Sequence, residues 1–247
     1  MKNNLKNKII VVTGGNGLLG KSIIDNIKSE GGIIINLDIN HKTSLDLLKI
    51  QCDVTDQISV DNSLKIITDK FNKIDGLVNN AYPRTNDWGD EFKKIKLSSW
   101  KKNIEMQLAS CFYITQKISE HMIKSKNGSI INIGSIYGEL GPDFSVYENT
   151  KITMPAAYSV IKGGIINFTR YLASYLGEYN IRCNCVSPGG IYDKQDEIFV
   201  KQYANKVPLK RMGTPQDISP LISFLLSDDS KYITGQNIKI DGGWSIK

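Results

Sequence analysis

The chain has 247 residues, of which 40% are hydrophobic and 23% are charged, which is the composition of an ordinary globular protein. Its net charge of +6 comes mainly from scattered lysines without a nucleic-acid-binding motif, so we expect no nucleic-acid partner. Four cysteines and two histidines without metal-ligand spacing argue against a metal site and against a histidine-based hydrolase. No run is long and apolar enough to cross a bilayer, and we find no signal-peptide cleavage site; we expect a cytoplasmic protein without a membrane partner.

Short runs rich in Val and Ile alternate with amphipathic stretches along the chain. The predicted strands, in order, are "KIIVVTGG", "GIIINLDI", a shorter run near "IQCDVTD", "DGLVNNA", "GSIINIGS", "IRCNCVSPGG" and "QNIKIDGG". The predicted helices are residues 18–29, "ISVDNSLKIITDKF", residues 98–126, residues 155–179 and a segment after "GTPQDIS". This alternation predicts a single α/β domain over residues 1–247, a Rossmann-type doubly wound parallel sheet of about seven strands with helices on both faces.

Two irregular stretches, residues 82–97 and 139–154, interrupt this alternation. Each comes just beyond the C-terminal end of a predicted strand. Ligands of open α/β sheets bind at that edge. We therefore expect both stretches to be substrate-loop insertions.

The first strand-to-helix turn, "TGGNGLLG" at residues 13–20, is rich in glycine. Glycines here let backbone N–H groups approach a diphosphate, and the N-terminus of the following helix adds the positive end of its dipole. Glycine also occurs simply to turn a chain, so the turn alone is weak evidence. The residues that we assign to cofactor binding at this turn are Gly14, Asn16, Gly17, Leu18, Leu19 and Gly20.

Asp38 ends the predicted second strand, 18 residues after the glycine-rich turn. A carboxylate there can accept hydrogen bonds from both hydroxyls of an adenosine ribose and repels a 2′-phosphate. Because no arginine occurs at positions 37–40, NAD(H) is favoured over NADP(H), although Lys42 leaves some NADP use open. Asp53, followed by Val54 in "CDVTD", is a candidate to bind the adenine amino group; an acid at a helix N-terminus is an equally good interpretation.

The pattern Tyr-x-x-x-Lys occurs twice, as Tyr147/Lys151 and as Tyr158/Lys162. On a helix this spacing places both side chains on one face, where the lysine charge favours phenolate and lowers the tyrosine pKa from ~10 toward the working range. The second pair precedes "GGIINFTRYLASYLG", a long apolar stretch that would hold it rigidly, whereas the first lies in a polar segment between two prolines. Rigidity therefore favours Tyr158 as the reactive tyrosine.

The chain resembles the short-chain dehydrogenase/reductase family over essentially its whole length. The matching pieces occur in family order: "TGGNGLLG", Asp38, "CDVTD", "NNA", "GSIINIGS", "YSVIKGG", "RCNCVSPGG" and "ITGQNIKIDGG". The resemblance implies reversible hydride transfer between the nicotinamide of NAD and a secondary alcohol or ketone of a small-molecule substrate. It also implies a homodimer or homotetramer, assembled through the two long helices beside the active site and the C-terminal strand.

The same resemblance assigns roles to particular residues. It implies that Tyr158 transfers the proton, that Ser135 orients the substrate oxygen, and that Lys162 assists Tyr158 and holds the nicotinamide ribose. The Tyr147/Lys151 pair then lies in an insertion. The remaining cofactor contacts that the resemblance implies are Asn79, Ala81, Pro188, Gly189 and Ile191.

Two departures from the family pattern concern catalysis. Alignment of "WKKNIEMQLASCF" places Gln107 where the family usually has a catalytic-site asparagine; Gln makes the same kinds of hydrogen bond, and Asn103, one turn earlier, is the alternative. Ser135 and Tyr158 are 23 residues apart, roughly ten more than is usual in the family. The extra segment is expected to be a substrate-covering lid, the alternative being a tolerated surface loop.

The candidate substrate contacts are Tyr82, Arg84 and Tyr147. Tyr82 replaces the usual glycine after "NNA", and Arg84 could clamp a phosphate or carboxylate or could simply face solvent. These features resemble a subgroup associated with bacterial surface-polysaccharide and flagellin-glycan sugar pathways, which implies a sugar or sugar phosphate as substrate. Two alternatives stay open: an epimerase or dehydratase that retains its NAD, and a catalytically impaired nucleotide-binding regulatory protein.

Overall fold

The computed structural model describes residues 4–246, so that residues 1–3 and 247 of the predicted domain lie outside it. Seven parallel strands form one sheet in the order β3-β2-β1-β4-β5-β6-β7. The predicted doubly wound parallel sheet is confirmed. The strands are β1 (Ile9–Thr13), β2 (Ile33–Asp38), β3 (Lys49–Gln51), β4 (Gly76–Asn79), β5 (Gly128–Ile133), β6 (Ile181–Pro188) and β7 (Asn237–Ile240).

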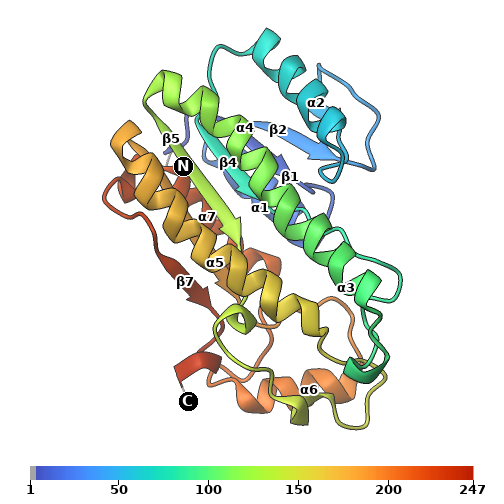
Figure 1. Cartoon of the computed structure of the whole chain (residues 1–247). Helices are drawn as coiled ribbons and strands as arrows, with labels where there is room; N and C mark the ends of the chain where they lie inside the picture. Colours follow the sequence, from blue (N-terminus) through green and yellow to red (C-terminus); the bar gives the residue numbers. More distant parts are fainter. Residues whose placement is uncertain (1–3, 247) are drawn as a thin grey trace.

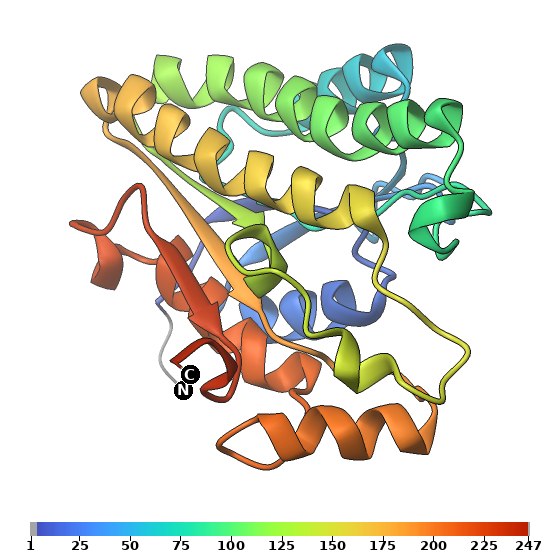
Figure 2. The ribbon, with the colours of Figure 1, turned by 60° about the horizontal axis from the view of Figure 1, so that its bottom comes forward.

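Helices cover both faces of this sheet (Figures 1 and 2). They are α1 (Leu18–Ser29), α2 (Gln57–Lys70), α3 (Leu97–Ile104), α4 (Ser110–Ser125), α5 (Ala156–Leu176), α6 (Glu197–Lys206) and α7 (Pro215–Leu226). One apolar core joins the sheet to α2, α4 and α5, and a second core joins its other face to α1 and α7. Since both faces are covered, central strands such as β1 and β5 are apolar along most of their length rather than alternating, and every one of their residues is buried.

The helix predicted over residues 98–126 is interrupted by a π-helical turn. Residues Glu105–Ala109 form this turn between α3 and α4. A π-helical turn accommodates one extra residue in a helix and occurs frequently at functional sites. The turn carries Gln107, which is buried.

Two other helices differ from the sequence prediction. The last helix begins at Pro215, inside "GTPQDIS" rather than after it, because Thr214 and Asp217 form a capping box there. Helix α6 was not predicted at all. It is short, and its buried residues, Phe199 and Tyr203, pack against an insertion that is distant in sequence instead of against the sheet.

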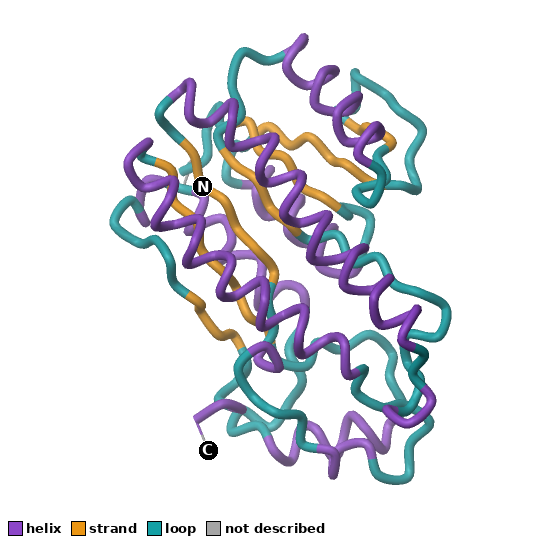
Figure 3. The backbone as a smooth tube through the Cα atoms, in the orientation of Figure 1, coloured by secondary structure: helices purple, strands orange, loops and turns teal. Residues whose placement is uncertain are grey.

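That insertion, residues 139–154, lies beyond the carboxyl edge of the sheet beside α6 (Figure 3). It contains a short 3₁₀ helix, Phe144–Tyr147, in which Val146 is completely buried. Asp143 forms a salt bridge with Lys206 of α6 at 3.0 Å, and the α6 residue Gln202 donates a hydrogen bond to the Glu148 carbonyl at 3.1 Å. The insertion and α6 therefore form one packed unit.

Candidate active site

A cleft of about 740 Å³ runs along the carboxyl edge of the sheet. It begins at the glycine-rich turn and Asp38, and its other end reaches Ser135, Tyr158 and Lys162. The topology places these distant residues together because parallel strands all end at the same edge. Most predicted site residues line the cleft: Gly14, Asn16, Gly17, Leu18, Leu19, Asp38, Asp53, Val54, Ala81, Tyr82, Arg84, Ser135, Tyr158, Lys162, Pro188, Gly189 and Ile191.

The glycine-rich turn has the geometry that a diphosphate requires. Gly14 has a φ of +63°, and a Cβ on it would stand 2.8 Å from the Ala81 Cα. A Cβ on Gly20 would collide with the Gly14 carbonyl, so Gly20 permits helix α1 to pack closely instead of lining the cleft. Gly17 caps α1 without a side-chain hydrogen bond, which leaves the first N–H groups of the helix available to an anion.

The carboxylate of Asp38 is held rigidly at the end of β2. One oxygen accepts a hydrogen bond from the Asn16 N–H at 2.9 Å and the other from the Asn40 N–H at 2.9 Å. Asp38 is 6% exposed. The cationic residues that line the cleft are Arg84 and Lys162, and both contact the Tyr82 ring at the Tyr158 end. No cationic residue of the cleft therefore neutralises the charge of Asp38 at the other end.

Asp53 also faces the cleft but does not cap a helix. Its carboxylate accepts hydrogen bonds from the backbone N–H of Thr55 at 2.9 Å and from the Thr55 hydroxyl at 2.7 Å. Asp56 is the N-cap of α2. The helix-capping interpretation of Asp53 is therefore wrong, and its position beside Val54 in the cleft leaves it available to an adenine.

The catalytic candidates come from β5 and α5. Ser135 follows β5 and is buried, and Tyr158 lies in the first turn of α5 with Lys162 one turn later. The ammonium of Lys162 donates a hydrogen bond to the Ile133 carbonyl at 2.7 Å and lies 5.6 Å from the Tyr158 ring centroid. Burial raises the pKa of Tyr158, while a hydrogen bond with Ser135 lowers it. Burial also lowers the pKa of Lys162 to about 8.

Aromatic rings fix the orientation of Tyr158. Its ring makes edge-to-face contacts with Tyr82, at 5.9 Å between centroids, and with Trp88, at 6.3 Å. The Arg84 guanidinium lies 5.6 Å from the Tyr82 ring. Since Tyr82, Arg84 and Trp88 all belong to the insertion 82–97, this insertion forms one wall of the reactive end of the cleft.

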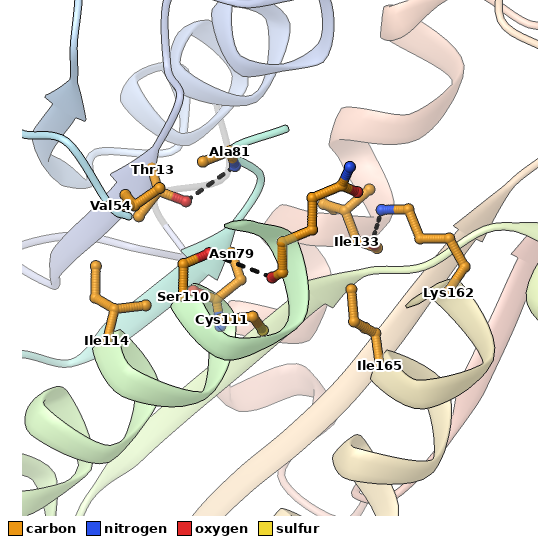
Figure 4. Close-up of a pocket in the computed structure, with 11 residues that line it drawn as sticks. Thr13, Val54, Asn79, Ala81, Ser110, Cys111, Ile114, Ile133, Lys162 and Ile165 are labelled. Carbon is orange, nitrogen blue, oxygen red and sulfur yellow. Dashed lines mark hydrogen bonds between the residues drawn. The ribbon is translucent and has the colours of Figure 1, made fainter. Parts of the chain in front are cut away.

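The two candidates for the proton relay have different surroundings. Gln107 is 5% exposed, and its Nε2 has no hydrogen-bond partner among the described residues. Lys162, Ser110 and Cys111 line a small cavity of about 20 Å³, enough for one water molecule (Figure 4). Gln107 lines the same cavity. In contrast, the side-chain amide of Asn103 is hydrogen-bonded to Thr85 in the insertion 82–97. Its Nδ2 donates to the Thr85 hydroxyl at 2.8 Å, and its Oδ1 accepts from the Thr85 N–H at 3.1 Å. This arrangement favours Gln107.

The Tyr147/Lys151 pair does not form a reactive site in this structure. Tyr147 ends its 3₁₀ helix, and Asn149, with a φ of 59°, turns the chain out of helical geometry before Lys151. Lys151 is exposed. The Tyr147 ring packs against Phe199 of α6 at 5.3 Å between centroids and does not line the cleft.

Some residues of the site differ from the sequence assignment. The amide of Asn79 points to the interior, where it donates to Thr115 and Asn132 at 2.8 Å each; its neighbour Asn80 is the one that lines the cleft. Sequence analysis also did not identify Tyr137, which lines the cleft. Its position two residues after Ser135 was the signal that could have identified it.

The structure also shows the state of the cysteines and the character of the helices. All four cysteines are free and buried. Within residues 4–246, no group of His, Cys, Asp and Glu side chains has the arrangement of a metal site. None of the helices in that range has the length and apolar character needed to cross a bilayer.

The chain is similar to a known protein family and to proteins of known sequence. The family model described as "Enoyl-(Acyl carrier protein) reductase" matches residues 20–245. The chain is 36% identical over 255 residues to the post-translational flagellin modification protein A of Campylobacter coli, covering 98% of this chain and 100% of that protein.

Two solved structures are also similar. One is a short-chain dehydrogenase from Leptospira borgpetersenii with bound NAD⁺, with a TM-score of 0.89, 32% identity and coverage of 98% of this chain and 94% of that chain. The other is the aldohexose dehydrogenase of Thermoplasma acidophilum, with a TM-score of 0.87, 26% identity and coverage of 100% and 97%.

Proposed function

The chain belongs to the short-chain dehydrogenase/reductase family of enzymes, oxidoreductases acting on alcohols and ketones, and from this premise we propose that it uses NAD(H) on a hydroxyl or ketone of a sugar or sugar phosphate. The observation that carries the proposal is the arrangement of the cleft. A fixed carboxylate, Asp38, lies at one end, and Ser135, Tyr158 and Lys162 lie at the other.

Ser135, Tyr158 and Lys162 have different roles in the proton transfer. When NAD is bound, its nicotinamide supplies the hydride acceptor. Ser135 donates a hydrogen bond to the substrate oxygen and holds it beside Tyr158, whose phenolate takes the hydroxyl proton during oxidation and returns it during reduction. The positive charge of Lys162, 5.6 Å from the ring, favours the phenolate and thereby opposes the effect of burial.

Gln107 would complete a path for that proton. Its unpartnered amide and the Lys162 ammonium border the same small cavity, which has room for a water molecule. Such a water would connect Lys162 to the polar groups of the π-helical turn. The longer side chain thus serves where the family usually has an asparagine.

Asp38 supports NAD(H) rather than NADP(H). Its buried carboxylate would face a 2′-phosphate at close range with no cationic cleft residue beside it. Lys42 is exposed and does not line the cleft. Replacing Asp38 by Ala is expected to raise the KM for NAD by roughly tenfold and to reduce the ratio of kcat/KM with NAD to kcat/KM with NADP.

Arg84 supports a substrate that carries an anionic group. It lines the cleft beside Tyr82, and among the described residues it forms no salt bridge. A free guanidinium in this position can bind a phosphate or carboxylate with two parallel hydrogen bonds. The likeness to a flagellin modification protein and to an aldohexose dehydrogenase supports a sugar as the carrier of that group.

We also propose that the protein assembles as a homodimer or homotetramer. The outer face of α4 and α5 carries exposed aromatic rings, among them Phe112 at 47% and Tyr171 at 62% exposure. Tyr171 and Tyr175 stack on each other at 6.1 Å between centroids. Light scattering at several protein concentrations tests this proposal, and a monomer throughout would contradict it.

The function is tested by measuring NAD reduction with a panel of aldohexoses, 2-amino-2-deoxyhexoses, their 6-phosphates and cyclohexanol. We expect the highest kcat/KM for a phosphorylated sugar, and we expect Arg84→Ala to remove most of the preference for the phosphate. Activity confined to acyl thioesters or steroids would refute the sugar assignment. Nucleotide that stays bound without net reduction would instead identify an NAD-retaining epimerase or dehydratase.

A further inference from the structure

Tyr137 lies two residues after Ser135 and lines the reactive end of the cleft. Its backbone N–H donates a hydrogen bond to the Ser135 hydroxyl at 3.2 Å, so that the position of the tyrosine is tied to that of the catalytic serine. The side chain belongs to the 3₁₀ turn Ile136–Gly138 and is 7% exposed. Tyr137 is thus a buried, rigidly held residue at the site where a substrate must lie.

The buried hydroxyl of Tyr137 makes no well-formed hydrogen bond among the described residues, and the Tyr147 phenol offers it only a weak one. A buried hydroxyl without a partner is unfavourable, and such groups in native proteins usually meet a ligand or an ordered water. The phenol of Tyr147 lies near it, and its proximity, after burial, raises the pKa of Tyr137. The Tyr147 hydroxyl in turn donates its hydrogen to the Met154 sulfur at 3.5 Å, which is also a weak bond, so that neither phenol has a strong partner.

The hydroxyl of Tyr137 lies where the insertion 139–154 meets α6, and Met154 is the neighbour that lines the cleft with it. Tyr147 and Met154 come from the insertion 139–154, and Tyr203, whose nearby phenol also raises the pKa of Tyr137, comes from α6. The glycine-rich turn and Asp38, which we assign to the nucleotide, come from β1 and β2, on the far side of β4 and β5 in the sheet. The unsatisfied phenol is therefore placed to meet the substrate rather than the adenosine part of the cofactor.

We propose that the hydroxyl of Tyr137 forms a hydrogen bond with a second hydroxyl of the substrate, on a carbon next to the one that Ser135 and Tyr158 hold. This inference rests on the proposed dehydrogenase function and narrows its substrate to compounds with neighbouring hydroxyl groups. Tyr137 is then a specificity-determining residue, and Tyr147 is a positioning residue that acts through it. An acyl chain or a steroid ring would leave the phenol buried and unpaired, which is how a polar site rejects an apolar substrate.

A pair of simple probes tests the proposal without knowledge of the natural substrate. trans-Cyclohexane-1,2-diol carries a neighbouring hydroxyl that cyclohexanol lacks. The wild-type enzyme should favour the diol by roughly tenfold in kcat/KM, as one uncharged hydrogen bond allows, and Tyr137→Phe should remove most of that preference. The variant should keep its kcat/KM for cyclohexanol within about twofold, because the phenylalanine preserves the ring.

Three further measurements separate this role from a structural one. The Kd of NAD, measured by calorimetry, should be the same for wild type and Tyr137→Phe. Tyr147→Phe should give a smaller loss of the diol preference, while Tyr232→Phe, at a fully exposed side chain, should give none. The best sugar of the wider panel and its monodeoxy analogues should give the same result. For one monodeoxy analogue only, the one that lacks the hydroxyl bound by Tyr137, wild type and Tyr137→Phe should have equal kcat/KM.

The proposal fails if Tyr137→Phe lowers kcat/KM for diol and cyclohexanol equally, or if it weakens NAD binding. Where turnover is slow, calorimetric titration of both probes into the enzyme saturated with NADH gives the same comparison as Kd values. Equal affinity of the wild type for the diol and for cyclohexanol would also refute the proposal. Circular dichroism verifies that the variant is folded; if it is not, the deoxy-sugar series on the wild type decides the matter. If the enzyme prefers the diol to cyclohexanol but does not act on sugars, that result would contradict only the proposed sugar function.

Discussion

The two Tyr-x-x-x-Lys pairs have the same spacing and opposite surroundings. Tyr158 and Lys162 lie on α5, one turn apart, with the lysine 7% exposed and bonded to the end of β5. Between Tyr147 and Lys151 the chain leaves helical geometry, so the lysine is exposed and the tyrosine packs on α6. We infer that a four-residue spacing serves proton transfer only where a rigid helix holds both side chains beside a cleft.

The largest difference between the pairs is expected from removing each hydroxyl. Tyr158→Phe should lower kcat by about 10³-fold, because the proton would have no acid or base to receive it. Stopped-flow measurement of NADH formation gives the rate. Tyr147→Phe should lower kcat by less than about threefold, since its hydroxyl reaches the substrate only through Tyr137. Comparable losses in the two variants would mean that the reactive tyrosine has been misassigned.

Replacing the lysines should give a smaller but still clear contrast. Lys162→Met retains an apolar stem of similar length but removes the charge that favours phenolate, so kcat should fall by about 10²-fold. Lys151→Met changes an exposed side chain and should leave kcat unchanged. Steady-state kinetics at saturating NAD provides both values. A Lys162→Met enzyme with wild-type kcat would exclude the ammonium from the mechanism.

The pH dependence should follow Tyr158 and Lys162. Burial raises the pKa of Tyr158 and lowers that of Lys162 to about 8. Oxidation needs the phenolate, so its kcat/KM should rise with pH by up to about tenfold per unit, whereas reduction needs the phenol and should fall with pH once the Tyr158 pKa is passed. Initial rates in both directions from pH 6 to 10 test this. Lys151→Met should leave both profiles in place, and profiles that run in the same direction would contradict the scheme.

The smallest catalytic effect is expected at the proton relay. Gln107→Leu preserves the volume of the side chain in the π-helical turn but removes the amide, and we expect roughly a tenfold loss of kcat with little change in KM. Gln107→Asn should recover part of the activity. Asn103→Leu provides the contrast, because it should lower thermal stability through its lost hydrogen bonds to the insertion 82–97. A Gln107→Leu enzyme with full activity would remove this residue from the relay.

The features that were predicted best from the sequence are those determined by residues close together in the chain. The strands are apolar runs, and the glycine-rich turn needs Gly14 because, at its φ of +63°, a Cβ would stand 2.8 Å from the Ala81 Cα. Asp38 was placed correctly because it ends a strand. The seven-strand parallel architecture follows from these local patterns together with the alternation of helices and strands.

Features formed by distant packing were not predicted. Helix α6 is stabilised by the insertion 139–154, so its own sequence carries little signal. The unpartnered hydroxyl of Tyr137 is visible only when all its neighbours are known. The insertion itself was expected as a lid, and its apolar core with Phe199 and Tyr203 shows that it packs against α6.

The central claim is tested most directly by a crystal structure of the enzyme with NADH and the best ketone or keto-sugar of the panel. The account predicts that the Tyr158 and Ser135 hydroxyls both lie within hydrogen-bond distance of the carbonyl oxygen, with the carbonyl carbon facing C4 of the nicotinamide. A complex in which the Tyr158 hydroxyl points away from that oxygen, or in which Tyr147 takes its place, would contradict the account.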